Sequence, residues 1–191
     1  MIMAIKIYID QGHNPRDYNT GAEGNGIYEQ DVTYEIGRRL YNLLSTNPEF
    51  EPRLSRPTPD TVLGTDNSSS LTTRVREANS WGADIFLSLH NNAAENSRAS
   101  GNEALTYSAS STVANALAEN ILEQLTLTTG LRNRGIVYRP GLYVLRKTEM
   151  PAVLVEMGFL SNPYDAELLS DSPYLFSTGI YRGILKYYGL L

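Results

Sequence analysis

Two histidines and two glutamates lie where apolar segments of this chain meet polar ones. The sequence contains only two histidines, and each ends an apolar run: "KIYIDQGH" ends at His13 and "ADIFLSLH" at His90. A third apolar run, "AVLVEMG", carries Glu156, and Glu29 opens a helix-like pattern after the first loop. The carboxyl ends of parallel strands share one edge of an open α/β sheet, so these side chains can converge although they are distant in sequence.

These residue types match a catalytic metal site. Zinc takes two imidazoles and one carboxylate in such sites and keeps a fourth position for water. A further carboxylate that is not a ligand would act as general base and acid. Spacing alone leaves other interpretations open: either histidine can be a hydrogen-bonded structural residue, and Glu29 can be a first-turn acid of a helix. A purely structural role fits Glu156 less well, because a carboxylate is costly to bury unless it is paired or functional.

The segments that would position these residues alternate between strands and helices. Apolar runs predict strands at 4–10, 50–55, 84–89, 103–107, 142–145 and 152–156. Helical spacing predicts helices from residue 29, after a serine cap at 68–70, over 113–125, and over 163–169 and 173–188. This alternation predicts a single α/β domain with a mostly parallel sheet and helices on both faces.

Composition narrows the possible functions. The chain has 191 residues, a net charge of −5 and no cysteine, which excludes disulfides and thiolate metal sites. No basic block or stripe indicates a nucleic-acid partner. The start "MIMAIKIYID" lacks a basic region and a cleavage site and is too short to span a bilayer. We therefore expect a first strand there, with no signal peptide and no membrane insertion.

Seven stretches of the sequence, taken in order, carry a resemblance to one enzyme family. Together they resemble the catalytic domain of zinc-dependent N-acetylmuramoyl-L-alanine amidases, cell-wall hydrolases of bacteria and their phages. The resemblance covers nearly the whole chain, from the first strand to the last helix. The stretches are "IYIDQGHNP", "GNGIYEQDVTYEIGRRL", "LSRPT", "LTTRVREANSWGADIFLSLHNNA", "GNEALTY", "LYVLRKTEMPAVLVEMGFLSNPYDAELL" and "GIYRGIL".

The resemblance implies a role for each of the four residues. It implies that His13, Glu29 and His90 bind Zn2+ and that Glu156 is the catalytic glutamate. It also implies one zinc amidase catalytic domain over residues 1–191, with a twisted sheet between helices and no separate wall-binding domain. The implied reaction is hydrolysis of the amide between the lactyl group of N-acetylmuramic acid and the L-alanine of the peptidoglycan stem peptide.

The resemblance also bears on where the protein acts and on access to its site. The implied place of action is the bacterial cell wall, on the extracellular or periplasmic side or after release at lysis, and we expect a monomer. Some members of the family carry a helical insertion after the second histidine that blocks the zinc. Here only "NNAAENSRASG" separates His90 from the next strand, so we expect an open site.

Four neighbouring residues have roles that the sequence leaves open. Asp10 can accept a hydrogen bond from a ligand imidazole or belong to a turn. Asn92 can fix its loop or orient a ligand, and Arg146 can meet a peptide carboxylate or stay solvated. Glu103 can line the cleft or pair with another side chain.

Two other functions compete with the amidase. One is a different zinc peptidase, such as a carboxypeptidase that trims stem peptides. Such enzymes commonly supply a histidine and a glutamate from one short motif, whereas His13 and Glu29 are far apart. The other is a wall-binding module that has lost catalysis, although all four key residues are present. The source also stays open among a sporulation autolysin, a phage endolysin and a fragment of a larger secreted enzyme.

Overall fold

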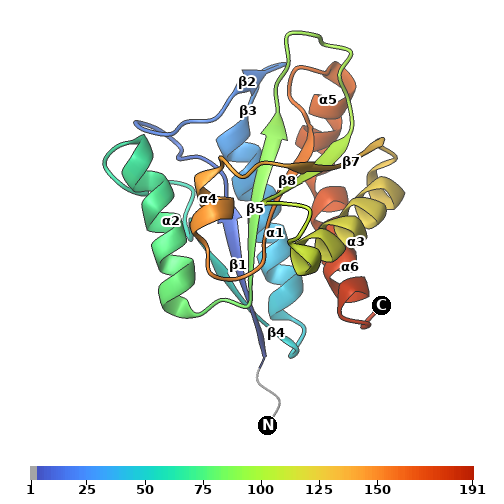
Figure 1. Ribbon diagram of the computed structural model, residues 1–191. Coiled ribbons are helices and arrows are strands. Elements are labelled where there is room, and N and C mark those ends of the chain that lie inside the picture. Colours follow the sequence, from blue (N-terminus) through green and yellow to red (C-terminus); the bar gives the residue numbers. More distant parts are fainter. Residues whose placement is uncertain (1–3) are drawn as a thin grey trace.

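A central sheet of six strands organises the fold, and the computed structural model describes residues 4–191 (Figure 1). Residues 1–3, part of the apolar start in which no signal peptide is predicted, lie outside the described residues. The strands lie in the order β4-β1-β5-β8-β6-β7. All neighbouring strands are parallel except β6 and β8, which are antiparallel. Their bounds are β1 Ile5–Gln11, β4 Phe50–Leu54, β5 Ile85–Asn92, β6 Asn102–Thr106, β7 Asn133–Tyr138 and β8 Ala152–Phe159.

Helices cover both faces of this sheet. Helices α1, α3 and α6 pack on one face, and α2 and α4 pack on the other (Figure 1). The alternation of side chains along β5 explains this, because Leu87 and Leu89 join the first core and Phe86 joins the second. The predicted single α/β domain is therefore confirmed. The helices are α1 Glu29–Ser45, α2 Asn67–Trp81, α3 Thr112–Thr129, α4 Tyr143–Lys147, α5 Pro163–Asp171 and α6 Pro173–Tyr187.

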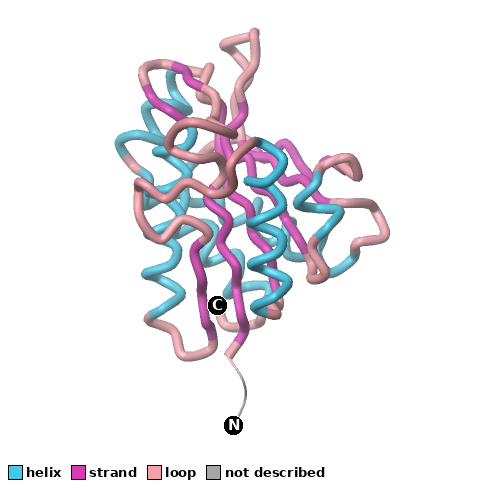
Figure 2. The backbone as a smooth tube through the Cα atoms, turned by 90° about the vertical axis from the view of Figure 1, so that its left-hand side faces the viewer, coloured by secondary structure: helices cyan, strands magenta, loops and turns pink. Residues whose placement is uncertain are grey.

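The loops that follow β1 and β5 gather at one end of the sheet. Figures 1 and 2 show these loops at the end opposite the N-terminus. A short hairpin of β2 (Glu23–Gly24) and β3 (Ile27–Tyr28) lies at the same end, between β1 and α1 in the chain. Within residues 4–191, no helix has both the length and the apolar character needed to cross a membrane.

Some sequence predictions about the elements are wrong. Residues 142–145 form no strand; instead the helix α4 begins at Tyr143 and buries Val144 and Leu145 against α2 and the sheet. A short apolar run does not distinguish a strand from one buried helical turn. Strand β7 was not predicted, because Gly135 (φ 86°) interrupts its pattern where the register on β6 shifts.

The N-cap of helix α2 is Asp66 and not one of the serines at 68–70, although Ser69 takes part in the cap. The Asp66 side chain accepts a hydrogen bond from the backbone N–H of Ser69 at 2.7 Å, and Ser69 Oγ accepts one from the Asp66 N–H at 3.0 Å. This reciprocal pair is a capping box. At the other end Gly82 (φ 67°) takes the left-handed conformation that ends many helices. Both ends of α2 are thus fixed, which fixes the side chains that it directs toward β1.

Candidate metal centre

Three side chains from three elements meet where the strands end. His13 follows β1, Glu29 is the first residue of α1, and His90 lies near the end of β5. Their ligand atoms all lie within 4.8 Å of one another. Glu29 Oε2 is 3.1 Å from His13 Nε2, and Glu29 Oε1 is 3.0 Å from His90 Nδ1. The structure therefore brings together two imidazoles and a carboxylate, which could hold one metal ion.

Glu29 is the buried member of this cluster, with a side chain 5% exposed. Its carboxylate accepts hydrogen bonds from the backbone N–H groups of Ala22 and Asn91, both at 3.0 Å. Burial alone would raise the pKa of Glu29, but the hydrogen bonds with His13 and His90 hold it well below its usual range. The carboxylate is thus ionised and fixed in place, as a metal ligand must be.

His13 has an unusual backbone and a defined ring orientation. Its φ is 68°, in the left-handed region that residues with a Cβ seldom adopt. Its ring atom Nδ1 lies 3.2 Å from the carbonyl oxygen of Asn19. Because a carbonyl oxygen only accepts, Nδ1 donates to it, which leaves Nε2, the ring nitrogen that lies nearer Glu29, as the atom available to a metal ion.

Gly12 allows the His90 ring to come close to the backbone that follows β1. A Cβ built on Gly12 would lie 2.5 Å from His90 Cε1 and 2.6 Å from His90 Nε2. The rings of His13 and His90 are 4.8 Å apart and nearly perpendicular, at 78°. Glycine at position 12 is therefore a steric requirement of this arrangement.

Glu156 approaches the same space from β8. It lies opposite His90 in the parallel pair of β5 and β8, and opposite Glu103 in the antiparallel pair of β6 and β8. Burial, reinforced by the negative charges of Glu29 and Glu103, raises the pKa of Glu156 to about 8. Its Oε2 is buried and has no hydrogen-bond partner within the described residues. A buried oxygen of this kind beside three ligand-type side chains fits a site that receives a further group, such as a water molecule or a substrate.

Asp10 has neither of the two roles considered from the sequence. It lies within β1, is 1% exposed, and forms an ion pair with Arg74 of α2. Its other oxygen accepts a hydrogen bond from Ser88 Oγ at 2.8 Å. The sequence patterns do not single out Arg74. The available signal was a charged residue between Leu71 and Ala78 on the apolar face of the helix pattern.

The remaining neighbours have simpler surroundings. Asn92 Nδ2 donates to Glu103 Oε1 at 2.9 Å, and Arg134 Nε lies 3.3 Å from Glu103 Oε2. Glu103 therefore has a pairing role. Arg146 is exposed and forms no ion pair within residues 4–191.

The surroundings of the cluster leave it accessible. The side chains of His13 and His90 are 19% and 20% exposed. The connection between β5 and β6, residues 93–101, contains no helix, which supports the predicted open site. A pocket of about 190 Å³ adjoins the two imidazoles, and its walls are largely apolar. The apolar side chains that line it are Leu71 of α2, Leu142, Tyr143 and Val144 around α4, and Leu154 of β8.

Comparisons with known proteins agree with one another. Residues 7–186 match the family model described as N-acetylmuramoyl-L-alanine amidase. The chain is 37% identical over 187 residues to the N-acetylmuramoyl-L-alanine amidase LytC of Bacillus subtilis (strain 168), which covers 95% of this chain and 35% of LytC. It is also 37% identical over 174 residues to the N-acetylmuramoyl-L-alanine amidase CwlM of Bacillus licheniformis, which covers 91% of this chain and 64% of that protein.

Solved structures give the same result. The crystal structure of N-acetylmuramoyl-L-alanine amidase from Clostridium difficile 630 matches with a TM-score of 0.86 and 31% identity, over 97% of both chains. The curated relatives are longer than this chain, which spans about a third of LytC and less than two thirds of CwlM.

Proposed function

Because this chain belongs to the N-acetylmuramoyl-L-alanine amidase family, we propose that it hydrolyses the amide between N-acetylmuramic acid and the L-alanine of the stem peptide in peptidoglycan. The observation that carries the proposal is the meeting of His13, Glu29 and His90 beside the unpartnered carboxyl oxygen of Glu156. An amide needs both an activated nucleophile and a proton for its leaving nitrogen. The three clustered residues would hold the metal that activates the water, and Glu156 would supply the proton.

The three clustered residues are proposed to hold Zn2+. Two imidazoles with one carboxylate are a donor set that zinc takes in catalytic sites. When bound, zinc supplies a Lewis acid that makes water more acidic and a carbonyl carbon more electrophilic. The chain prepares this set: two backbone N–H groups orient Glu29, and the contact of His13 Nδ1 with the Asn19 carbonyl oxygen would leave Nε2 to bind the metal.

Glu156 is proposed to move the proton. Its carboxylate takes a proton from the attacking water as the water oxygen forms a bond to the carbonyl carbon. The same carboxyl then gives that proton to the alanine nitrogen as the C–N bond breaks and its electron pair stays on nitrogen. The alanine therefore leaves as an amine rather than as an amide anion. The raised pKa of Glu156, about 8 in the metal-free chain, makes its carboxylate a stronger base than an ordinary glutamate, so that it can take this proton and keep it until the nitrogen receives it.

The proposed substrate fixes the proposed place of action. Peptidoglycan lies outside the cytoplasm, so the protein would act on the cell wall. Residues 7–186, which match the family model, would form the catalytic domain. A monomeric state stays a prediction, to be measured by size-exclusion chromatography with light scattering.

Mass spectrometry of digested peptidoglycan tests this function. Purified peptidoglycan is treated with zinc-loaded protein, with Glu156→Gln, and with Glu167→Gln as a control, since Glu167 is an exposed glutamate on α5. We expect stem peptides with a free L-alanine amine from the native protein and the control, and none from Glu156→Gln. Cleavage within the stem peptide would favour the carboxypeptidase alternative. An intact wall with zinc bound would favour a wall-binding module.

A further inference from the structure

The His13 backbone needs support from its surroundings. Among the described residues, four non-glycine residues have a positive φ, and the other three are Asp17, Asn19 and Asn25. Asp and Asn tolerate this region better, because their short side chains can bond to the local backbone. The His13 ring is turned toward Glu29 and Asn19 instead, so it gives its own backbone no such bond. Other groups must hold the conformation.

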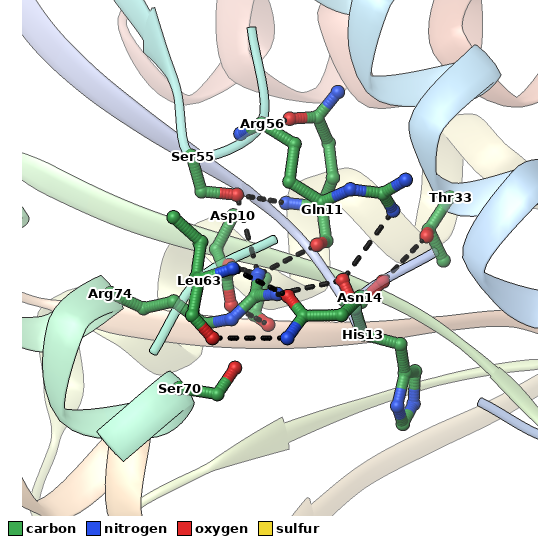
Figure 3. A network of polar contacts seen from close by, with 12 residues as sticks. Asp10, Gln11, His13, Asn14, Thr33, Ser55, Arg56, Leu63, Ser70 and Arg74 are labelled. Atoms are coloured by element: carbon green, nitrogen blue, oxygen red, sulfur yellow. Dashed lines mark hydrogen bonds and ion pairs between the residues drawn. The ribbon is translucent and has the colours of Figure 1, made fainter. Parts of the chain in front are cut away.

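Arg74 of α2 supplies this support through one guanidinium group. Arg74 Nη2 donates to the His13 carbonyl oxygen at 2.7 Å, and Nη1 donates to the Gln11 carbonyl oxygen at 2.7 Å. These two carbonyls lie on either side of Gly12, so the guanidinium spans the turn that leads from β1 to His13. Figure 3 shows the His13 imidazole pointing away from this network while the backbone of His13 faces it.

The guanidinium is itself anchored to the sheet. The side chains of Arg74 and Asp10 are 1% and 2% exposed and form an ion pair. Asp10 also accepts a hydrogen bond from Ser88, which lies two residues before His90 in β5. Burial opposes ionisation of Asp10, but the Arg74 guanidinium keeps the pKa of that carboxyl below its usual value. Through Asp10, Arg74 therefore connects helix α2 to β1, which leads to His13, and to β5, which carries His90.

Neighbouring groups do not replace Arg74 as the donor to the His13 carbonyl oxygen. Arg56 is also buried, but its Nη1 is 3.4 Å from the His13 oxygen and 2.9 Å from the Gln30 oxygen, so Gln30 is its main acceptor. Thr33 Oγ1 donates to the Gly12 oxygen at 2.8 Å, one residue earlier. The only short hydrogen bond to the His13 carbonyl within the described residues is the one from Arg74.

We propose that Arg74 is a positioning residue that holds His13 in its left-handed conformation, so that the metal centre is formed before an ion binds. The inference rests on the proposed metal centre and does not depend on which bond the protein cleaves. It predicts that lysine cannot replace Arg74. A lysine ammonium can keep the charge pair with Asp10, but it lacks the planar fork that reaches two carbonyls at once.

Zinc affinity and stability, measured separately, test the proposal. The variants are Arg74→Lys and Val75→Ala. Val75 is the next residue of α2, is buried, and belongs to the hydrophobic core between the sheet and helices α2 and α4. Affinity is measured by competition with a chromophoric zinc chelator, and stability by thermal unfolding without metal. We expect Arg74→Lys to bind zinc about 10–100-fold more weakly, the usual effect of losing a group that orients a ligand. We expect Val75→Ala to lose stability and keep its zinc affinity.

A second readout reports on His13 directly. In the 1H–15N spectrum of the metal-free protein, the amide signals of His13 and Asn14 should shift in Arg74→Lys and stay in place in Val75→Ala.

Unchanged zinc affinity in folded Arg74→Lys, or an equal loss of zinc affinity in Val75→Ala, would overturn the proposal. If Arg74→Lys does not fold, Asp10→Asn keeps the guanidinium and removes its charged anchor. A smaller loss of zinc affinity is then expected, and no loss would overturn the proposal. Zinc binding needs no substrate, so a failed amidase assay leaves this test intact.

Discussion

The polar groups around His13 and those around Glu156 lie on two sides of one site, and they differ in how completely they are satisfied. On the His13 side, the carbonyl oxygens of Gln11, Gly12 and His13 each accept a side-chain hydrogen bond. On the Glu156 side, two carboxylates face each other across β6 and β8, and Glu156 Oε2 has no partner within the described residues. The first side suits a role in which atoms stay fixed. The second side suits a role in which a proton comes and goes.

The difference has an electrostatic counterpart. Hydrogen bonds from the histidines keep the pKa of Glu29 low in spite of burial, whereas burial and two nearby carboxylates raise the pKa of Glu156 to about 8. Two glutamates in the same site are thus separated into an ionised group and a group that holds a proton readily. Environments that push two carboxyl pKa values apart are typical of sites where one carboxylate binds and the other transfers protons.

The largest expected effect comes from removing the proton-transfer group. Glu156→Gln should lower the rate of amide hydrolysis by roughly 10²–10⁴-fold, the usual contribution of a general acid or base. Zinc affinity should change little, because Glu156 lies outside the cluster of three ligand-type residues. Steady-state hydrolysis of a muramyl peptide and chelator competition measure the two quantities. Parallel loss of zinc binding would mean that Glu156 is a ligand.

Next in size is the loss of a proposed ligand. Glu29→Gln removes the charge and should weaken zinc binding by more than the about 10–100-fold expected for a supporting residue. Native protein should gain about 2.7 kcal/mol of stability when free zinc is 100 times its Kd. The variant should gain far less at the same zinc concentration. Thermal unfolding with and without zinc measures this, with Glu167→Gln as the matched exposed control.

The sequence predicts some of the residues on the His13 side and the Glu156 side of the site and not others, depending on the kind of contact that places each residue. Strand-end positions follow from apolar runs, so the convergence of His13, His90 and Glu156 could be anticipated from parallel topology alone. The partner of Asp10 could not be predicted from the sequence, because the ion pair between Asp10 and Arg74 depends on how α2 is rotated against β1. Local patterns carry no information about such a contact.

Element boundaries show the same limit. Helices α1 and α6 have long periodic patterns, and their predictions are confirmed. The five-residue helix α4 and the two-residue strands β2 and β3 are too short for any period to be visible, and tertiary contacts decide their structure. Their bounds matter for function, since α4 supplies walls of the pocket beside the imidazoles.

A smaller effect concerns stability and pH in the metal-free protein. The pKa of Glu156 is about 8 in the folded chain against an ordinary value of 4.5, so between these values the folded state binds a proton that the unfolded state has released. The free energy of unfolding should therefore fall as pH rises from about 4.5 to about 8, and then level off. The fall should be at most a few kcal/mol, because Glu156 keeps partial exposure to water. Denaturant titrations in EDTA should show this slope in native protein and not in Glu156→Gln. Equal slopes would contradict the raised pKa.

The smallest expected effect sharpens the contrast between Arg74 and Arg134, two arginines that each pair with a carboxylate near the site. The Arg74 pair is almost fully buried, whereas Arg134 and Glu103 have side chains 34% and 18% exposed. Ion pairs open to solvent contribute about 0–1 kcal/mol, so Glu103→Gln should change stability by no more than that. The amide oxygen can still accept the hydrogen bond from Asn92. Because one nearby negative charge is removed, the pH slope due to Glu156 should end at a slightly lower pH, and zinc affinity should stay the same. If Glu103→Gln weakened zinc binding as much as Arg74→Lys, the Glu156 side would also fix the metal ligands, and the division between a fixed side and a proton-transfer side would be wrong.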